Sequence, residues 1–408
     1  METRTNNIKR SLYISNLGLM DNLGMTQILP YIKGLAEKGV EFIIISYEKK
    51  EHIDNKAKIK HIKRILDKYD IRWITLQYHH RWGNIYDIFV GLFLAVKITW
   101  DENVDIIHAR ASIPMFFAFP VAKLFGKRII YDRRGTVRGD FIDDVDVKNI
   151  CSLNFFAIIL DAIDRFFIRH SDAIIVLSER GKRLLKEGDL TGRQDVTCEA
   201  IPCCVNMERF VNLDSAVQQA LDLSDKFVLT YVGSLGTCYL LDEMIDFFTI
   251  LKKIEQNAFF LIVSHSDADM INSTFLNKGI LRGDYAVVDA APDEVPGWLN
   301  KSKCSVMFIK EVECKIGSSP TKFAESLAAG IPVVVNKNIG DTENLICANR
   351  LGSVVESLDE KGYSDSIYCL REVLKDGFSL SERCKTVASK LFSMELGIEK
   401  YKRIYESL

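Results

Sequence analysis

This chain of 408 residues has no long apolar run, no cysteine pattern of a metal site and no excess charge of one sign. A membrane-spanning helix needs roughly 18 to 20 apolar residues in a row, and no stretch reaches that length. A net charge of -2 gives no general attraction to nucleic acid, so we expect no nucleic-acid partner. The ten cysteines are scattered apart from Cys203 and Cys204, and no secretory signal is present. We therefore expect reduced thiols, no metal site and a cytoplasmic protein.

The composition is that of a globular protein with a sizeable core. Hydrophobic residues make up 48% of the chain and charged residues 26%. The length predicts about two or three domains. A polar stretch at residues 211–226 is a candidate connection between two of them.

Strand and helix patterns alternate through the first half, as in a parallel sheet covered by helices. The loop after the first strand contains Gly18 and Gly24, without the Gly-x-Gly-x-x-Gly spacing of dinucleotide-binding folds. We expect Gly24 either to form a turn with positive φ or to let the backbone approach a substrate. The strand patterns lie at 11–15, 40–46, 73–78, 104–111, 127–136, 172–179 and 201–205, and helical patterns at 26–38, 56–69, 84–100 and 154–169.

Polar residues follow two successive strands of this predicted sheet. One strand pattern ends in His108 and Arg110, and the next ends in Asp132 and Arg134. Ligands of open α/β sheets gather beyond the carboxyl ends of the strands, so both ends point to one cleft. Alternatively, the arginines pair with nearby carboxylates and only hold loops in place.

A second α/β set begins at residue 227. Its first strand runs into a glycine loop that contains Gly233, Ser234 and Gly236. This set therefore predicts a second Rossmann-like domain. Its further strand patterns lie at 259–264, 285–289, 304–309 and 331–335, and its helical patterns at 239–254, 292–302 and 379–408.

The stretch 318–336 has the clearest local pattern in the chain. Ser319 is a suitable N-cap, Pro320 fits the first helical position, and Gly330 ends the helix before an apolar strand of three valines. The unpaired amides at such a helix start suit a phosphate.

Lys322 is a second indication of a ligand at this helix start. A cation in the first turn opposes the helix dipole unless an anion lies between them. Ser318 and Thr321 add hydroxyl groups to the same turn. The alternative is a well-capped helix with an ordinary surface pair of Lys322 and Glu325.

Seven motifs, in order, resemble the retaining family-4 type glycosyltransferases of the GT-B fold, especially the bacterial group that assembles surface polysaccharides. They are NLGMTQ, IIHARAS, YDRRG, IIVLSE, IPCCVNMERF, YVGSLGT and SSPTKFAESLAAGIPVV. The resemblance implies two Rossmann-like domains that face a central cleft, with a C-terminal helix that crosses back to the N-terminal domain. We expect an acceptor-binding domain at 1–208, joined by about 393–408, and a donor-binding domain at 209–392.

The resemblance also implies roles for individual residues. The helix start would face the donor diphosphate, with Lys322 beside it, and Glu325 would hold the ribose hydroxyls. The implied donor-binding residues are Gly233, Ser234, Ser318, Ser319, Thr321, Lys322 and Glu325. The implied catalytic residues are Arg110, Asp132 and Arg134, and the implied acceptor loop contains Gly24 and Met25.

The chain departs from the family pattern at several positions. The first glutamate of the family's Glu-seven residues-Glu motif is Gly317 here, and Glu311 or Glu313 would have to replace it. Thr237–Leu241 lacks the usual arginine and lysine, and Cys203 and Cys204 replace the common Asn-Gly. The histidine that many members carry near Asp132 is missing too. These departures leave the expected fold unchanged, but they leave the identity of the nucleotide-sugar donor open.

The implied function is retaining transfer of a sugar, of the hexosyltransferase type, from a nucleotide-sugar to a saccharide or lipid-linked saccharide. We expect a role in capsule, exopolysaccharide or lipopolysaccharide synthesis, with the donor as a substrate and neither cofactor nor metal. Residues 84–100 and 114–125 could lie at the inner face of the cell membrane or form core helices. The alternatives are a nucleotide-sugar epimerase of the same fold and a non-catalytic nucleotide-sugar-binding partner of a polysaccharide synthase.

Overall fold

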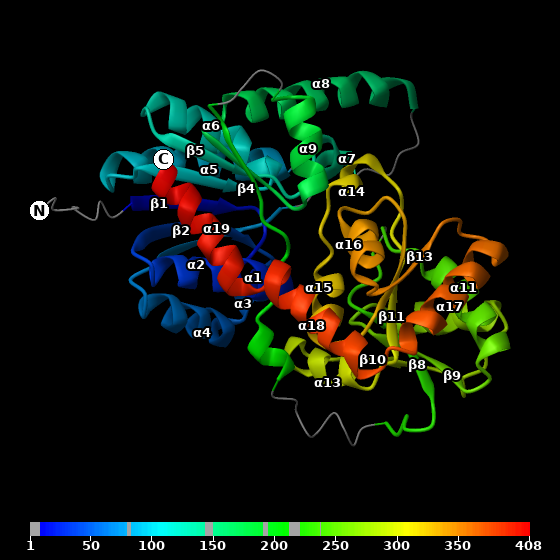
Figure 1. Cartoon of the computed structure of the whole chain (residues 1–408). Helices are drawn as coiled ribbons and strands as arrows, with labels where there is room; N and C mark the ends of the chain where they lie inside the picture. The colour runs from blue at the N-terminus through cyan, green and yellow to red at the C-terminus, as the bar shows by residue number, and fades with distance from the viewer. Residues whose placement is uncertain (1–8, 80–82, 143–149, 191–194, 212–220, 237) are drawn as a thin grey trace, which may run out of the picture. The chain divides into compact units, whose positions relative to one another are not determined.

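Two structural units make up the chain, and each is built on one parallel β-sheet (Figure 1). This computed structural model describes residues 9–79, 83–142, 150–190, 195–211, 221–236 and 238–408. The first unit consists of Met1–Ile201 with Glu395–Leu408, and the second of Pro202–Met394. The chain thus changes unit after Ile201, earlier than the predicted boundary at residue 208.

The first unit has a seven-stranded sheet in the order β3-β2-β1-β4-β5-β6-β7. All neighbouring strands are parallel, so their carboxyl ends lie along one edge. The strands are β1 Lys9–Ser15, β2 Val40–Glu48, β3 Arg72–Gln77, β4 Ile106–Arg110, β5 Arg128–Asp132, β6 Ala173–Val176 and β7 Thr197–Ala200. The helices are α1 Asn22–Gln27, α2 Leu29–Ala36, α3 Lys50–Asp54, α4 Lys56–Asp67, α5 Gly83–Asp101, α6 Ser112–Leu124, α7 Val137–Ile142, α8 Ile150–His170, α9 Glu179–Glu187 and α19 Met394–Ser407.

The second unit has a six-stranded parallel sheet in the order β10-β9-β8-β11-β12-β13. Its strands are β8 Phe227–Val232, β9 Ala258–Val263, β10 Tyr285–Val288, β11 Cys304–Met307, β12 Val333–Asn336 and β13 Gly352–Val355. Its helices are η1 Met207–Phe210, α11 Leu241–Ile254, α12 Ala268–Asn277, η2 Pro292–Glu294, α13 Val295–Asn300, α14 Glu313–Ile316, α15 Thr321–Ala328, α16 Thr342–Asn349, α17 Glu360–Leu374 and α18 Phe378–Phe392.

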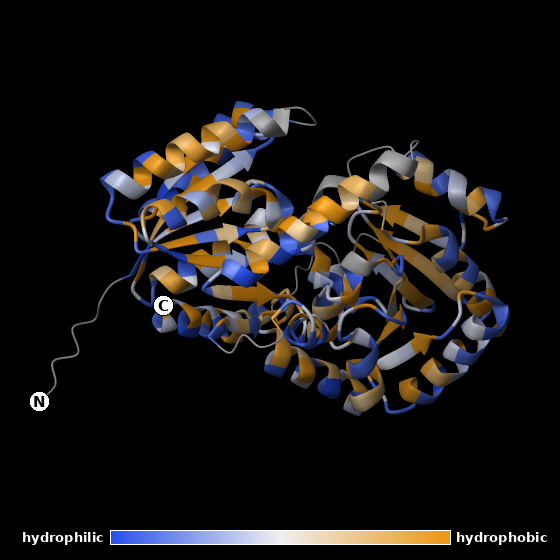
Figure 2. Ribbon diagram, turned by 90° about the horizontal axis from the view of Figure 1, so that it is seen from above, coloured by the Kyte–Doolittle hydropathy of each residue, from blue (hydrophilic) through white to orange (hydrophobic). Residues whose placement is uncertain are grey.

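Apolar strands form the centre of both units. Figure 2 shows the strands of both sheets as predominantly hydrophobic, as expected where helices cover both faces. Large side chains such as Tyr131, Phe117 and Phe260 are fully buried between sheet and helices. Each buried side chain of this size contributes about 1.5 to 3 kcal/mol relative to an exposed one.

Two predicted elements differ from the structure. The expected strand at 201–205 is not one; β7 lies just before it, and Val205 forms only a single bridge to Ser393. Pro202 lacks the N–H that a continuing strand needs. The helix expected at 26–38 begins earlier, as α1, and restarts as α2 with Pro30 in its first turn.

Candidate functional site

Arg110, Asp132 and Arg134 lie together at the carboxyl edge of the first unit's sheet. Arg110 and Asp132 are register partners at the ends of β4 and β5. Arg134 contacts both carboxylate oxygens of Asp132, with Nε 2.8 Å from Oδ1 and Nη2 3.0 Å from Oδ2. Nη1 of Arg110 donates to Oδ2 at 3.2 Å. The structure thus brings the three predicted residues together. Both arginines pair with a carboxylate, as in the alternative in which they only hold loops in place.

The C-terminal helix α19 joins this cluster through two tyrosines. Tyr401 donates its hydroxyl to Oδ2 of Asp132 at 2.9 Å and also contacts Arg134. Tyr405 lies 2.7 Å from Nδ1 of His108, whose Nε2 lies 3.4 Å from the Asp132 carboxylate. Asp132 therefore links three elements of the first unit, namely β4, β5 and α19. The sequence prediction missed both tyrosines; their i, i+4 spacing places them on one helix face.

The charged groups of the cluster shift one another's pKa values. Burial alone would raise the pKa of Asp132, but Arg134, His108 and Arg110 together hold it well below its usual range. Burial lowers the pKa of His108, and the Asp132 carboxylate opposes that effect only in part. Both guanidinium groups contact the one buried carboxylate of Asp132 at this sheet edge.

Gly24 occupies a tightly packed position in the first unit. Its φ is not positive, which contradicts the turn interpretation. A Cβ atom there would overlap the carbonyl oxygen of Gly18 and lie 2.7 Å from the Cα atom of Leu19. The close approach is therefore to the chain's own backbone. Met25 is half-buried in the same helix, with its N–H bonded to the Asp21 carbonyl at 2.9 Å.

The helix start predicted to bind phosphate is α15 in the second unit. The helix begins at Thr321 with Pro320 in the N-cap position, so the prediction of Ser319 as N-cap was wrong. Ser319 instead accepts the N–H of Cys203 at 3.3 Å, and Ser318 donates to the carbonyl of Lys315 at 2.8 Å. No side chain caps the helix. The first-turn amides are left without a capping side chain, as an anion site requires.

Lys322 extends from this turn into a pocket of two tyrosines. Its Nζ lies 2.8 Å from the Tyr231 hydroxyl, 4.3 Å from the Tyr231 ring centroid and 3.4 Å from that of Tyr239. Burial lowers the pKa of Lys322 to about 7, although Glu325 raises it in part. The alternative of an exposed surface pair is wrong, because both side chains are largely buried.

The glycine loop after β8 lies against the same ammonium. Gly233 has a φ of +106°, which disfavours any side chain, and a Cβ atom there would lie 3.1 Å from Nζ of Lys322. The carbonyl of Ser234 accepts the Tyr231 hydroxyl at 2.9 Å. The sequence prediction missed Tyr231 and Tyr239, although each flanks the glycine loop. The loop, the lysine and the helix start thus form one group.

Glu325 faces Arg209, which the sequence prediction also missed. Nη1 of Arg209 lies 3.9 Å from the Glu325 carboxylate. Burial raises the pKa of Glu325, and Arg209 and Lys322 oppose this. Arg209 lies in the motif IPCCVNMERF, which could have indicated it. Glu311 accepts a hydrogen bond from Asn338 at 2.9 Å, and the side chain of Glu313 lies outside the described residues.

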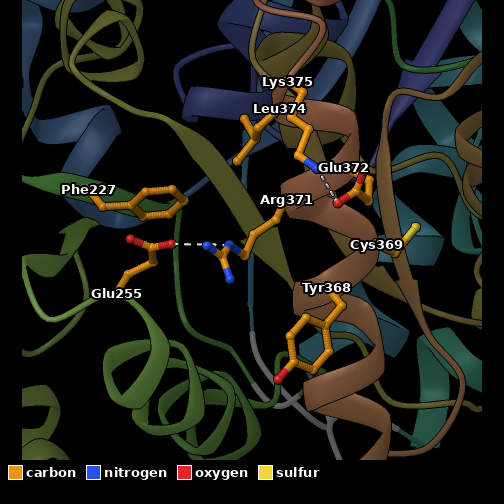
Figure 3. Close-up of a pocket in the computed structure, with 8 residues that line it drawn as sticks. All are labelled: Phe227, Glu255, Tyr368, Cys369, Arg371, Glu372, Leu374 and Lys375. Atoms are coloured by element: carbon orange, nitrogen blue, oxygen red, sulfur yellow. Dashed lines mark hydrogen bonds and ion pairs between the residues drawn. The ribbon is translucent and has the colours of Figure 1, made fainter.

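A separate pocket of about 720 Å³ lies at the other edge of the second unit's sheet, near the amino end of β8 (Figure 3). Its charged groups pair with one another: Arg371 with Glu255 at 3.2 Å, and Lys375 with Glu372 at 2.6 Å. None of the predicted site residues lines it. The carboxyl edge, and not this pocket, holds the group around Lys322.

The comparisons with known proteins agree with this architecture. Residues 26–209 match the model of Glycosyltransferase Family 4. No curated protein matches the chain. A sucrose-phosphate synthase from Thermosynechococcus elongatus has a similar structure, with a TM-score of 0.74 and 14% identity over 98% of each chain.

Two further solved structures share the fold. A glycosyltransferase from Rickettsia africae has a TM-score of 0.69 and 19% identity over 98% of each chain. Anabaena HepE, solved in complex with UDP-glucose, has a TM-score of 0.70 and 13% identity over 98% of this chain and all of its own. The resemblance and the fold class expected from the motifs are thereby confirmed: the chain has the GT-B fold, and its residues 26–209 match the family-4 glycosyltransferases.

Proposed function

We propose that the protein is a retaining, hexosyltransferase-type glycosyltransferase that moves a sugar from a nucleotide-sugar to a saccharide or lipid-linked saccharide. The surface polysaccharides of bacteria are the proposed products. The observation that carries the proposal is the group around Lys322: an ammonium in a tyrosine pocket, next to a glycine loop and an uncapped helix start.

The group suits a nucleoside diphosphate in its charge and in its hydrogen-bond donors. A diphosphate placed at the start of α15 would accept hydrogen bonds from its amides and supply the counter-charge for Lys322. The hydroxyls of Thr321 and Ser318 lie in the same segment. Glu325, the next turn along, is the proposed acceptor of ribose hydroxyl groups, with Arg209 beside it.

The proposed chemistry follows from these contacts. The anomeric carbon gains positive character as the diphosphate leaves, so stabilising the leaving charge and positioning the acceptor are the main requirements. Lys322 and the helix amides would stabilise the leaving phosphate. The acceptor hydroxyl would pass its proton to the departing donor phosphate. For Arg110, Asp132 and Arg134 we propose a role in turnover, supported by their position together at the carboxyl ends of β4 and β5.

A lipid-linked acceptor would bring the protein to a membrane surface, and α5 offers a suitable face. Among the helices of the described residues, none has the length and apolarity needed to cross a membrane. Along α5, Phe89, Phe93 and Trp100 are each more than 60% exposed, and Lys97 lies in the same stripe. Aromatic rings with a lysine among them favour the interface of a lipid surface with anionic headgroups.

The first test is thermal stability against UDP-, GDP-, ADP-, CMP- and dTDP-sugars. A ligand that binds the native state raises the melting temperature. We expect one nucleotide to raise it and Lys322→Ala to weaken that donor by roughly 10- to 100-fold, the value of a charge-assisted contact. Lys303→Ala removes an exposed lysine at the amino end of β11 and is the matched control.

Unchanged donor affinity in Lys322→Ala would contradict the diphosphate site. Donor binding without sugar transfer would favour the non-catalytic partner, for which Gly317 in place of a glutamate is the supporting observation. A product that is an epimer of the donor sugar would favour the epimerase.

A further inference from the structure

A histidine–aspartate pair lies at the carboxyl end of β3 in the first unit, outside the groups described above. His79 follows β3 by two residues, and its ring Nδ1 lies 2.6 Å from Oδ1 of Asp87. The second carboxylate oxygen accepts the backbone N–H of His79 at 2.8 Å. One carboxylate therefore holds both the backbone and the ring of His79.

The two members of the pair differ in exposure. The Asp87 side chain is 8% exposed and that of His79 is 37% exposed. Tyr47 donates its hydroxyl to the backbone carbonyl of Asp87 at 2.6 Å and so fixes the start of α5 against β2. With Nδ1–H directed at the carboxylate, a neutral imidazole keeps Nε2 as a hydrogen-bond acceptor. Nε2 forms no hydrogen bond with the part of the chain that the structure describes.

The surroundings of the pair suit a saccharide. The Tyr86 ring is 62% exposed and lies edge-on to the His79 ring, with the centroids 5.6 Å apart. Sugars are bound by aromatic rings that cover their apolar face and by a few fixed polar groups that contact their hydroxyls.

A second histidine–aspartate pair in the chain lacks these features. His265 and Asp289 in the second unit are also in contact, but their side chains are 44% and 75% exposed. An exposed ion pair of this kind contributes little to the stability of the fold. The buried carboxylate, the fixed backbone and the neighbouring aromatic ring single out His79.

We propose that His79 and Tyr86 bind the acceptor saccharide, with Nε2 of His79 accepting a hydrogen bond from an acceptor hydroxyl and the Tyr86 ring stacking on the sugar. Asp87 acts through His79 and is a positioning residue. This inference rests on the proposed function, because it names the acceptor site of the same transfer reaction.

Two variants of His79 test the roles of the two ring nitrogens separately. In His79→Asn the side-chain amide can replace Nδ1 and keep the contact with Asp87, but it does not reach the position of Nε2. In His79→Gln the amide replaces Nε2 and loses the contact with Asp87. His61→Gln removes an exposed histidine from α4 of the same unit and is the matched control.

The readout is the set of imidazole signals of the seven histidines in NMR spectra, titrated with methyl glycosides of glucose, galactose, mannose, rhamnose and N-acetylglucosamine. We expect at least one glycoside to shift the His79 signal and to leave the His61 signal in place. For that glycoside, isothermal titration, which does not depend on the His79 signal, should show that His79→Asn weakens binding at least tenfold and that His79→Gln weakens it less. Tyr86→Ala, a surface change, should also weaken it.

Either of two results would overturn the proposal: no glycoside shifts the His79 signal, or His79→Asn and Tyr86→Ala bind the glycosides within twofold of wild type. The melting temperature of wild type with nucleotide-sugars is measured separately. If no nucleotide-sugar raises it, the proposed function fails whatever the histidine signals show. If a donor binds equally well to wild type and to His79→Asn, the donor site is intact in the variant. A loss of glycoside binding is then a change in the acceptor site alone.

Discussion

The two units carry positive charge at the carboxyl edges of their sheets in different ways. In the first unit Arg110 and Arg134 both pair with the buried Asp132, which also binds α19 through Tyr401. In the second unit the ammonium of Lys322 has tyrosine rings and a hydroxyl around it. No carboxylate of the described residues lies within ion-pair distance of it.

The arginines of the first unit therefore stabilise the structure through Asp132. The ammonium of Lys322, in contrast, remains available to a ligand. A buried ammonium without a counter-ion costs free energy, which is why the pKa of Lys322 falls to about 7. A bound anion would offset that cost. In the first unit both arginines are already paired with Asp132, and the same carboxylate attaches α19 through Tyr401. The predictions below test this contrast.

The largest effect is expected for Asp132→Asn. It leaves two buried guanidinium groups without their carboxylate, which typically costs about 3 to 5 kcal/mol in the free energy of unfolding. Urea unfolding measures the loss. As a control, Lys375→Ala breaks an exposed pair with Glu372 and should cost less than about 1 kcal/mol. Equal losses in the two variants would show that the buried cluster does not hold the unit.

The next effect is a pH dependence of donor binding. In the proposed site the diphosphate would bind protonated Lys322, whose pKa in the free protein is about 7, and binding would raise that pKa. Donor affinity should therefore be nearly constant below pH 7 and fall by up to about tenfold per pH unit above it, until the pKa of the bound state is reached. Isothermal titration between pH 6 and 9 measures this.

The matched variant for this pH profile is Lys322→Met, which keeps most of the aliphatic side chain without a titrating group. Its donor affinity should be lower and flat across the same pH range. A slope that persists in Lys322→Met would assign the titration to another group.

A smaller effect is expected for Glu325→Gln. The amide keeps the size of the side chain but replaces one acceptor oxygen with a donor, so a contact to ribose worth about 1 to 2 kcal/mol would be lost. We expect donor affinity to fall roughly tenfold. The 2′-deoxy form of the donor should lose less affinity in this variant than the ribose form does. Equal losses for both forms would place the ribose elsewhere.

The smallest effect is expected for Tyr401→Phe. It removes the hydrogen bond to Asp132 and the one from Arg134, but leaves the contacts of both arginines with Asp132 in place, so the cost should be about 1 to 2 kcal/mol. Thermal unfolding measures it, and the donor-induced shift in melting temperature should be unchanged. A loss as large as that of Asp132→Asn would mean that α19, rather than the arginines, is the main partner of the carboxylate.

Much of the fold could be predicted because the local pattern and the tertiary environment agree. The buried strands β2, β8, β9 and β12 are near-continuous apolar runs, and such runs are what a parallel sheet requires. The patterns failed where a strand is short and mixed in composition. β7 has the sequence TCEA and β13 has GSVV, and neighbouring strands rather than their own apolarity fix them in the sheet.

The candidate site was predicted unevenly for a similar reason. Lys322 and Glu325 could be found because they lie in one helical turn with a recognisable start. Tyr231 is about 90 residues from Lys322 along the chain and Arg209 about 115 residues from Glu325, and only folding brings them to that turn. The same holds for Tyr401 and Asp132.

The sequence by itself determined the two α/β sets, the buried strands and the motif order that indicates a GT-B glycosyltransferase, because these depend on residues close together in the chain. The tertiary structure alone decided the environment of each charge. Asp132 is paired with arginines and attached to α19, whereas Lys322 is enclosed by tyrosines. The state of a charged side chain depends on burial and on partners distant in sequence, and no local pattern specifies either.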